Sequence, residues 1–256
     1  MFKKKRTIDI IMPNYNKGQF IVEAINSVIK QTYKNWRLFI IDDNSTDESK
    51  KKLKQYRKKK RIKVFYLKKN KGPAYCRNLG LKKSKSNFVA FLDSDDYWYK
   101  NKLKLQLRFM LDKNYAFTFS DYTPILFYKN KFKKLKITKL ENEFTFDKFI
   151  KNSSINTSTM MLEKKEIKNI KFKNLELMED YIFKCDLMRK TKIKFQKFPQ
   201  STAIYRIFKK SRSSKKINNI YNLWRINKKY NNLNFLNNLI SLIFISLNSI
   251  KKYGFK

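Results

Sequence analysis

The chain has 256 residues, with 61 basic and 20 acidic side chains, a formal charge of +41 and no histidine. The missing histidine excludes Ser-His-Asp hydrolases and histidine-ligated zinc enzymes. Two cysteines, Cys76 and Cys185, are too few for a four-cysteine zinc site or a disulfide-rich scaffold and are expected to pack as small apolar side chains. The composition is 42% hydrophobic, as in globular proteins. The charge fits either compositional bias or a surface that attracts polyanions or an anionic membrane.

Strands and helices alternate over the first 120 residues. Apolar runs predict strands at 8–12, 36–41, 62–67, 87–92 and 115–120, and the segments between them predict helices at 19–31, 49–60, 73–83 and 98–112. Ser45 and Glu48 fit a capping box for the lysine-rich helix 49–60. Short connections between alternating elements predict an α/β fold, with a mostly parallel central sheet and helices on both faces.

The alternation breaks after residue 120. The segments 123–128 and 132–138 fit a hairpin, 144–151 and 178–189 fit helices, and 157–162, 193–198 and 202–207 fit strands. The tail, 211–256, is rich in lysine and asparagine. Within it, 231–253 has the pattern of an amphipathic helix that either packs on the core or lies in a membrane interface.

Nothing near the start of the chain predicts membrane insertion. The apolar run before Pro13 has five residues, too few for a signal peptide, and no stretch of 18 apolar residues follows. The expected location is the cytoplasm, with peripheral contact to the inner face of the plasma membrane as an open alternative.

Polar side chains gather where the predicted strands end. Asp93, Asp95 and Asp96 directly follow an apolar strand, either as ligands of a divalent cation or as an acidic turn before a helix. Asp42 and Asp43 end another strand, where a carboxylate accepts hydrogen bonds from a base or ribose or else forms an Asx turn. Ligands of such sheets bind outside the carboxyl ends of the strands. A loop with Asn70 and Gly72 permits a left-handed backbone beside a ligand, and Arg77 follows it.

The order of four motifs is more specific than any one of them. PNYN at 13–16, DDNSTD at 42–47, NKGPAYCRNLG at 70–80 and FLDSDDYW at 91–98 together closely resemble family-2 glycosyltransferases with the GT-A fold, over about residues 7–210. The resemblance implies that Pro13, Tyr15, Asp42, Asp43, Asn70 and Gly72 bind the nucleotide, and that Arg77 approaches the diphosphate or ribose. It also implies that Asp93-Ser94-Asp95 is a D-x-D element, in which Asp93 faces the ribose or sugar and Asp95 binds Mn²⁺ or Mg²⁺.

The later motifs complete the implied site. Glu179-Asp180 resembles the family's acidic pair, with Asp180 as the catalytic base and Glu179 as its neighbour. Thr157, Ser158 and Thr159 resemble a strand lining the acceptor pocket, and Tyr205-Arg206 resembles a loop near the donor phosphates. The family commonly has a histidine two residues after that arginine; here it is Phe208, which leaves water, Lys209 or Lys210 to replace it.

The resemblance implies an inverting, metal-dependent enzyme. It would transfer a sugar from a nucleoside-diphosphate sugar to a hydroxyl of a glycan or lipid-linked acceptor in surface-polysaccharide synthesis. The donor expected from the family is a UDP-sugar. The expected domains are a GT-A domain at 1–210 and a basic helical tail at 211–256. Within the GT-A domain, 1–115 would bind the donor and 116–210 the acceptor. The alternatives are a nucleotidyltransferase acting on a sugar phosphate, or a basic nucleic-acid-binding protein. The latter is disfavoured because lysine is spread along the chain and no nucleic-acid-binding motif appears.

Overall fold

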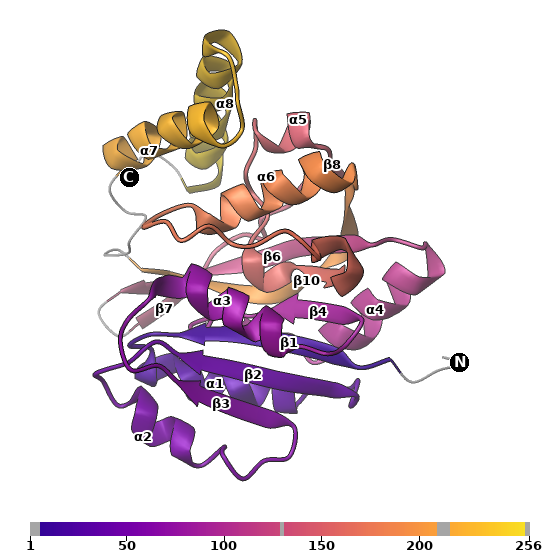
Figure 1. Ribbon diagram of the computed structural model, residues 1–256, viewed down its shortest axis with the longest axis vertical. Coiled ribbons are helices and arrows are strands. Elements are labelled where there is room, and N and C mark those ends of the chain that lie inside the picture. Colours follow the sequence, from indigo (N-terminus) through magenta and orange to yellow (C-terminus); the bar gives the residue numbers. More distant parts are fainter. Residues whose placement is uncertain (1–5, 129–130, 209–215, 254–256) are drawn as a thin grey trace.

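The computed structural model describes residues 6–128, 131–208 and 216–253. Within these ranges, ten strands form one mixed sheet with the order β3-β2-β1-β4-β9-β6-β10-β5; β7 pairs with β6 and β8 with β10. Helices cover both faces of this sheet, and the last two helices stand together at one end of the molecule (Figure 1). The predicted fold class is confirmed.

The first half is a parallel α/β unit. The strands β1 (Ile8–Asn14), β2 (Trp36–Asp42), β3 (Ile62–Tyr66) and β4 (Phe88–Phe91) are joined through α1 (Gly18–Ile29), α2 (Ser49–Lys54) and α3 (Gly72–Lys83). Alternate residues of β1 enter opposite cores: Ile11 packs in the cluster on the α3 side, whereas Ile10 packs with Ile21 of α1. Both faces of the strand are therefore buried, which explains its uninterrupted apolar sequence.

The second half extends the same sheet with longer strands. β5 (Tyr97–Trp98) and α4 (Lys102–Asp112) lead into β6 (Phe117–Tyr128), which pairs in parallel with β10 (Phe195–Phe208). The remaining elements are β7 (Lys131–Lys134), β8 (Glu143–Phe144), α5 (Phe146–Phe149), η1 (Thr157–Thr159), β9 (Met161–Glu163), η2 (Lys164–Ile167) and α6 (Glu179–Thr191). The predicted hairpin is present, because β6 and β7 pair in antiparallel register.

Several boundaries differ from the prediction. The predicted strands 115–120 and 123–128 are one strand, β6, and 193–198 and 202–207 are one strand, β10. The predicted strand 157–162 is wrong for Thr157, Ser158 and Thr159, which form the 3₁₀ helix η1 because the Asn156 side chain accepts from the Ser158 amide, and the strand β9 begins at Met161. Helix 49–60 is reduced to the six residues of α2, because a lysine-rich sequence repels itself along a helix and only Ser49 and Leu53 are buried. The capping box is wrong: Ser45 Oγ donates to Asp42 Oδ2 at 2.7 Å instead.

The tail consists of α7 (Lys216–Lys229) and α8 (Phe235–Tyr253). Leu223 and Ile226 of α7 belong to the larger core cluster, so α7 packs on the main body of the protein. Across the described residues, no helix is long and apolar enough to cross a membrane.

Candidate active site

The carboxyl ends of β1 and β2 are joined by Asp42. Its Oδ2 accepts hydrogen bonds from Asn14 Nδ2 at 2.8 Å and Ser45 Oγ at 2.7 Å, and its Oδ1 accepts one from the Ser45 amide at 3.1 Å. Asp42 is fully buried. The structure thus places Asp42 as a support for the loop after β2, while its predicted contact with the nucleotide stays a prediction.

Asp43 connects this loop to the next one. Its two carboxylate oxygens accept hydrogen bonds from the amides of Lys71 and Gly72, at 2.7 and 2.8 Å, at the start of α3. Gly72 has φ +84°, a conformation that side chains disfavour, so glycine meets the backbone demand of this turn. Asn70 Nδ2 donates weakly to the Asp43 carbonyl at 3.4 Å. The predicted donor loops are therefore one connected unit.

Tyr15 is an exposed member of the predicted nucleotide-binding set. It is 46% exposed and lies directly after β1, whereas Pro13 is buried within that strand opposite Ile41. An exposed aromatic ring at a strand end is suited to stacking on a base.

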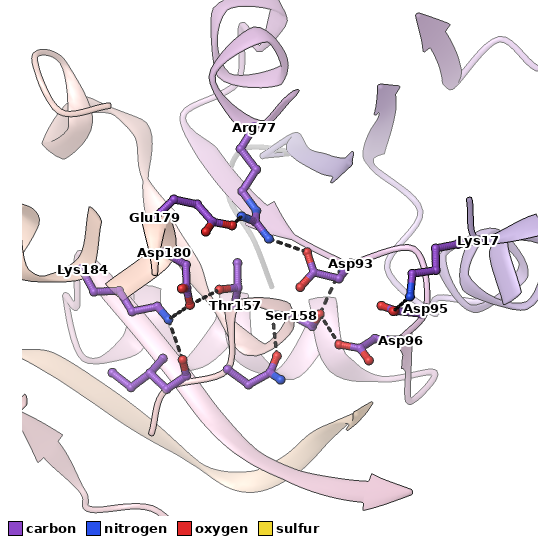
Figure 2. A network of polar contacts seen from close by, with 12 residues as sticks. Lys17, Arg77, Asp93, Asp95, Asp96, Thr157, Ser158, Glu179, Asp180 and Lys184 are labelled. Carbon is purple, nitrogen blue, oxygen red and sulfur yellow. Dashed lines mark hydrogen bonds and ion pairs between the residues drawn. The ribbon is translucent and has the colours of Figure 1, made fainter. Parts of the chain in front are cut away.

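Arg77 links the two halves of the site. Its guanidinium donates to Asp93 Oδ1 at 2.8 Å and to Glu179 Oε1 at 3.0 Å, although Glu179 is 102 residues away in the chain (Figure 2). Burial would lower the pKa of Arg77, but the carboxylates of Asp93 and Glu179 outweigh it and hold that pKa above its usual value. The end of β4 and the start of α6 are thereby fixed beside each other.

Asp180 follows Glu179 on α6. Its Oδ2 accepts hydrogen bonds from Lys184 Nζ at 2.6 Å and Thr157 Oγ1 at 3.1 Å (Figure 2). Burial would raise the pKa of Asp180, but the Lys184 ammonium dominates and lowers it to about 2. The carboxylate is therefore ionised at neutral pH, and its side chain is still 36% exposed.

The backbone before this acidic pair is strained. Met178 has φ +63°, in the left-handed region that few side chains adopt. The residue forms the N-terminal boundary of α6, and the strain therefore lies directly before Glu179. Such outliers persist where the surrounding contacts over-determine the backbone, and they occur often at functional sites.

Asp96 and Ser158 hold the D-x-D loop in place. Ser158 Oγ donates to Asp96 Oδ2 at 2.6 Å and accepts from the Asp93 amide at 3.1 Å, while Ser158 O accepts from Trp98 Nε1 at 2.7 Å. Burial, followed by the charges of Asp95 and Asp93, raises the pKa of Asp96 well above its usual value. Ser94, Ser158 and Thr159 are also buried, so these three predicted ligand contacts stay predictions.

Lys17 forms an ion pair with Asp95, the predicted metal ligand. Lys17 Nζ is 2.7 Å from Asp95 Oδ2 and 4.5 Å from the centre of the Phe208 ring. Phe208, where the family commonly has histidine, thus contributes an aromatic face below a cation. Lys209 and Lys210, the expected substitutes for that histidine, lie outside the described residues.

Arg206 supports the same loop from β10. Its side chain donates to the Asp95 carbonyl and pairs with Glu23, and its amide donates to Asp96 Oδ1 at 3.0 Å. The Arg206 side chain is only 1% exposed. The ring of the neighbouring Tyr205 packs against Tyr122. Contact between this pair and the donor phosphates stays a prediction.

The residues present are compatible with a divalent cation. Asp95 and Asp93 are 20% and 30% exposed, so both carboxylates are open to solvent at one edge. Within the described residues, no group of three or more acidic, cysteine or histidine side chains is placed to hold a metal. Mg²⁺ and Mn²⁺ bind readily to one or two carboxylates with phosphate oxygens and water completing the coordination, so this small donor set fits a cation shared with a diphosphate.

The acidic residues of the site were predicted from the sequence, but their basic and acidic partners were not. The sequence did not predict that Lys17, Lys184 or Glu23 would take part, because these lie among 61 basic and 20 acidic side chains with no local pattern to mark them. The spacing of Lys184 four residues after Asp180 was the one available signal, since such pairs meet on one helix face.

Comparison with known proteins identifies the family. The model of the glycosyl transferase family 2 matches residues 9–171, more than half of the chain. The chain belongs to this family. The predicted resemblance and the predicted enzyme class, a glycosyltransferase, are confirmed, and family membership favours this class over a nucleotidyltransferase.

Two relatives match almost the whole chain. A putative teichuronic acid biosynthesis glycosyltransferase, TuaG, of Bacillus subtilis is 31% identical over 97% of this chain and 98% of its own. The Escherichia coli enzyme WfgD, named UDP-Glc:alpha-D-GlcNAc-diphosphoundecaprenol beta-1,3-glucosyltransferase, is 32% identical over 97% of this chain and 95% of its own. These names bear out the resemblance to surface-polysaccharide enzymes.

A solved structure confirms the fold. Residues 1–349 of TarS of Staphylococcus aureus, in complex with UDP-GlcNAc, superpose with a TM-score of 0.70 over 96% of this chain and 73% of that one. At 21% identity, this likeness concerns the fold alone.

Proposed function

We propose that this glycosyltransferase transfers a sugar from a UDP-sugar to a hydroxyl of a lipid-linked acceptor, with inversion of the anomeric carbon and with a divalent cation. The single observation that carries the proposal is the Arg77 bridge between Asp93 and Glu179. It brings the base candidate on α6 next to the D-x-D edge, where the donor would bind.

Asp180 has the features of a general base. It is ionised and partly exposed, and Thr157 and Lys184 both donate to its Oδ2, which holds the carboxylate in one orientation. A pKa of about 2 makes it a weak base toward a free hydroxyl. Transfer of the acceptor proton to Asp180 would therefore accompany formation of the C–O bond, as the hydroxyl becomes acidic. One base and one displacement imply inversion.

The donor would lie across the ends of β1, β2 and β4. Tyr15 would stack on the base, and the loop fixed by Asp43 and Gly72 would carry the nucleoside. Asp95, with Asp93, would hold Mn²⁺ or Mg²⁺. The cation, when bound, supplies positive charge that stabilises the leaving diphosphate. Arg77 would act as a positioning residue, since its Nη1 and Nη2 each donate to a carboxylate and its side chain is only 6% exposed.

The relatives support the choice of substrates. WfgD is named for UDP-Glc and a diphosphoundecaprenol-linked acceptor, and TuaG for teichuronic acid biosynthesis. We therefore propose a role in surface-polysaccharide synthesis. Residues 1–115 would bind the donor, 116–210 the acceptor, and 211–256 would form the tail, at the cytoplasmic face of the plasma membrane.

UDP release tests the function. The chain would be incubated with UDP-Glc, UDP-GlcNAc or UDP-Gal and a synthetic α-GlcNAc-diphospholipid, with Mn²⁺ or with EDTA. We expect acceptor-dependent UDP release with one of these donors, its loss in EDTA, and a β-linkage by NMR from the α-linked donor. An α-linkage would contradict inversion, and full activity in EDTA would contradict the cation. No turnover with any donor would contradict the proposed substrates.

A further inference from the structure

The inward side of helix α8 is mixed, because Leu242 and Ile245 pack on the core beside buried asparagine and serine side chains, and its outward side is apolar. Asn227 Nδ2 donates to Ser241 Oγ at 2.9 Å, and Ser241 Oγ donates to the Ile150 carbonyl. Asn238 Nδ2 donates to the Trp224 carbonyl at 3.1 Å, and Asn248 Nδ2 to the Lys151 carbonyl at 3.1 Å. Asn238 and Ser241 are buried. An ordinary surface helix buries its apolar side chains and exposes its polar ones, whereas α8 buries Asn238 and Ser241 and leaves several large apolar side chains exposed.

The outward side of α8 is a continuous apolar stripe. Leu236, Leu239, Ile243 and Leu247 recur three or four residues apart, which places them on one face of a helix. They are 63%, 39%, 49% and 57% exposed, and Phe244 is 49% exposed. Phe235 at the start of α8, which contacts Trp224, and Ile220 and Tyr221 on α7 add further exposed apolar surface. Exposed apolar patches of this kind mark interaction sites.

The charge around the stripe indicates what covers it. Residues 216–253 contain Lys216, Arg225, Lys228, Lys229, Lys251 and Lys252, and the sequence has no acidic residue after Asp186. Arg225, Lys228, Lys229 and Lys251 are exposed on α7 and α8. A second copy of this chain, with the same charge of +41, would be repelled, whereas an anionic lipid surface is complementary.

We propose that the outward face of α7 and α8 docks on an anionic lipid bilayer, with the stripe Leu236, Leu239, Ile243 and Leu247 at the acyl boundary. The helix lies in the interface and does not span the bilayer, in agreement with the asparagine and serine side chains on its inner side. The two helices stand clear of the donor-binding half at one end of the molecule (Figure 1).

The docking face is connected to the catalytic region. The loop that receives α8 at Ile150 and Lys151 continues to Ile155, whose carbonyl accepts from Lys184 at 2.7 Å, and to Thr157, which contacts Asp180. Docking would therefore hold the bilayer on the side of the protein where this loop, which contacts Lys184 and Asp180, supports α8. The inference rests on the proposed function for this purpose only, because binding to lipid needs neither donor nor acceptor.

Flotation with vesicles tests the proposal. The full chain would be mixed with vesicles of phosphatidylcholine containing 30% phosphatidylglycerol or with pure phosphatidylcholine. The substitutions are Ile243→Asn and Leu247→Asn, and the matched control is Ile137→Asn, which is also 49% exposed but lies away from α7 and α8. We expect the chain to bind the anionic vesicles. Each tail substitution should lower the affinity for them about fivefold, and both together at least tenfold, because each removes about half the free energy of burying a leucine or isoleucine side chain.

Separate variants test the basic side chains, and a separate measurement tests self-association. Arg225→Gln and Lys228→Gln should each weaken binding to anionic vesicles about fivefold, with Lys58→Gln as the control. Unchanged vesicle binding by the double tail variant would overturn the proposal. The proposal would also be overturned if the wild-type chain did not bind vesicles but formed dimers in sedimentation, and if the double tail variant did not form them. The occupant of the apolar stripe would then be a second copy of the chain. Transfer to a water-soluble acceptor by the double variant keeps this failure separate from failure of the proposed function.

Discussion

Lys184 controls the charge of the proposed base, and its removal is a sharp test of that role. Its ammonium group is buried and contacts only two oxygens that the structure shows, Asp180 Oδ2 at 2.6 Å and the Ile155 carbonyl at 2.7 Å. In Lys184→Met the burial of Asp180 is no longer opposed by this cation, so the pKa of Asp180 rises. The acid limb of kcat/KM should move to higher pH by about one to two units.

The stability effect follows from the same contact. In the protein the pKa of Asp180 is lowered from 3.8 to about 2, so its contribution to folding is complete above about pH 4 and is lost as the pH falls toward 2. The full shift would correspond to about 2.4 kcal/mol, and screening by solvent at a side chain that is 36% exposed reduces it to about 1 kcal/mol.

The assay is UDP release as a function of pH from about 2.5 to 8, so that an acid limb displaced upward from about 2 falls within the range, with thermal melts at each pH to confirm that the variant stays folded. Lys190→Met is the matched control, because Lys190 lies exposed on the same helix. The reasoning is refuted if Lys184→Met keeps the wild-type acid limb. It is also refuted if the wild-type enzyme already loses kcat/KM with a midpoint near pH 6, since another group would then be the base.

Three further substitutions address the rest of the site. Asp180→Asn should bind donor normally in a thermal-shift titration with UDP-sugar yet lose about 10²–10⁴-fold in kcat, whereas loss of donor binding would reassign the residue. Lys17→Ala should strengthen the binding of Mn²⁺ in the presence of UDP, measured by calorimetry, because the ammonium group no longer competes for Asp95; weaker binding would show that Lys17 assists the cation. Arg77→Met should lower the free energy of unfolding in urea by about 3 kcal/mol, because the buried Glu179 loses its partner, and a change below 1 kcal/mol would contradict the bridge.

The sheet was accessible from sequence because its strands are short, apolar runs bounded by polar loops. β1, β2, β3 and β4 lie within two residues of their predicted ends, and the acidic motifs fall at their carboxyl ends as expected. The pairing of β6 with β10 was not predicted, since these strands are about 80 residues apart and nothing local specifies a parallel partner.

In the candidate site, too, local motifs were predicted from the sequence and long-range contacts were not. The D-x-D element and the Glu179-Asp180 pair were predicted through a family resemblance, whereas the contacts of Lys17 with Asp95 and of Ser158 with Asp96 bridge 62 to 78 residues and depend on the finished fold. The tail pattern left two alternatives open. In the structure α8 packs on the core through Ser241 and Asn248 together with Leu242 and Ile245, and leaves a second apolar side exposed. Periodicity alone does not decide which side packs, because both sides of the helix have the same period.

The most direct test of the central claim is a crystal structure of Asp180→Asn with an intact UDP-sugar and Mn²⁺. The account predicts the diphosphate at the Asp93–Asp95 edge, and the side chain of residue 180 on the face of the anomeric carbon opposite the leaving group. A donor bound elsewhere, or one whose anomeric carbon faces away from residue 180, would contradict it.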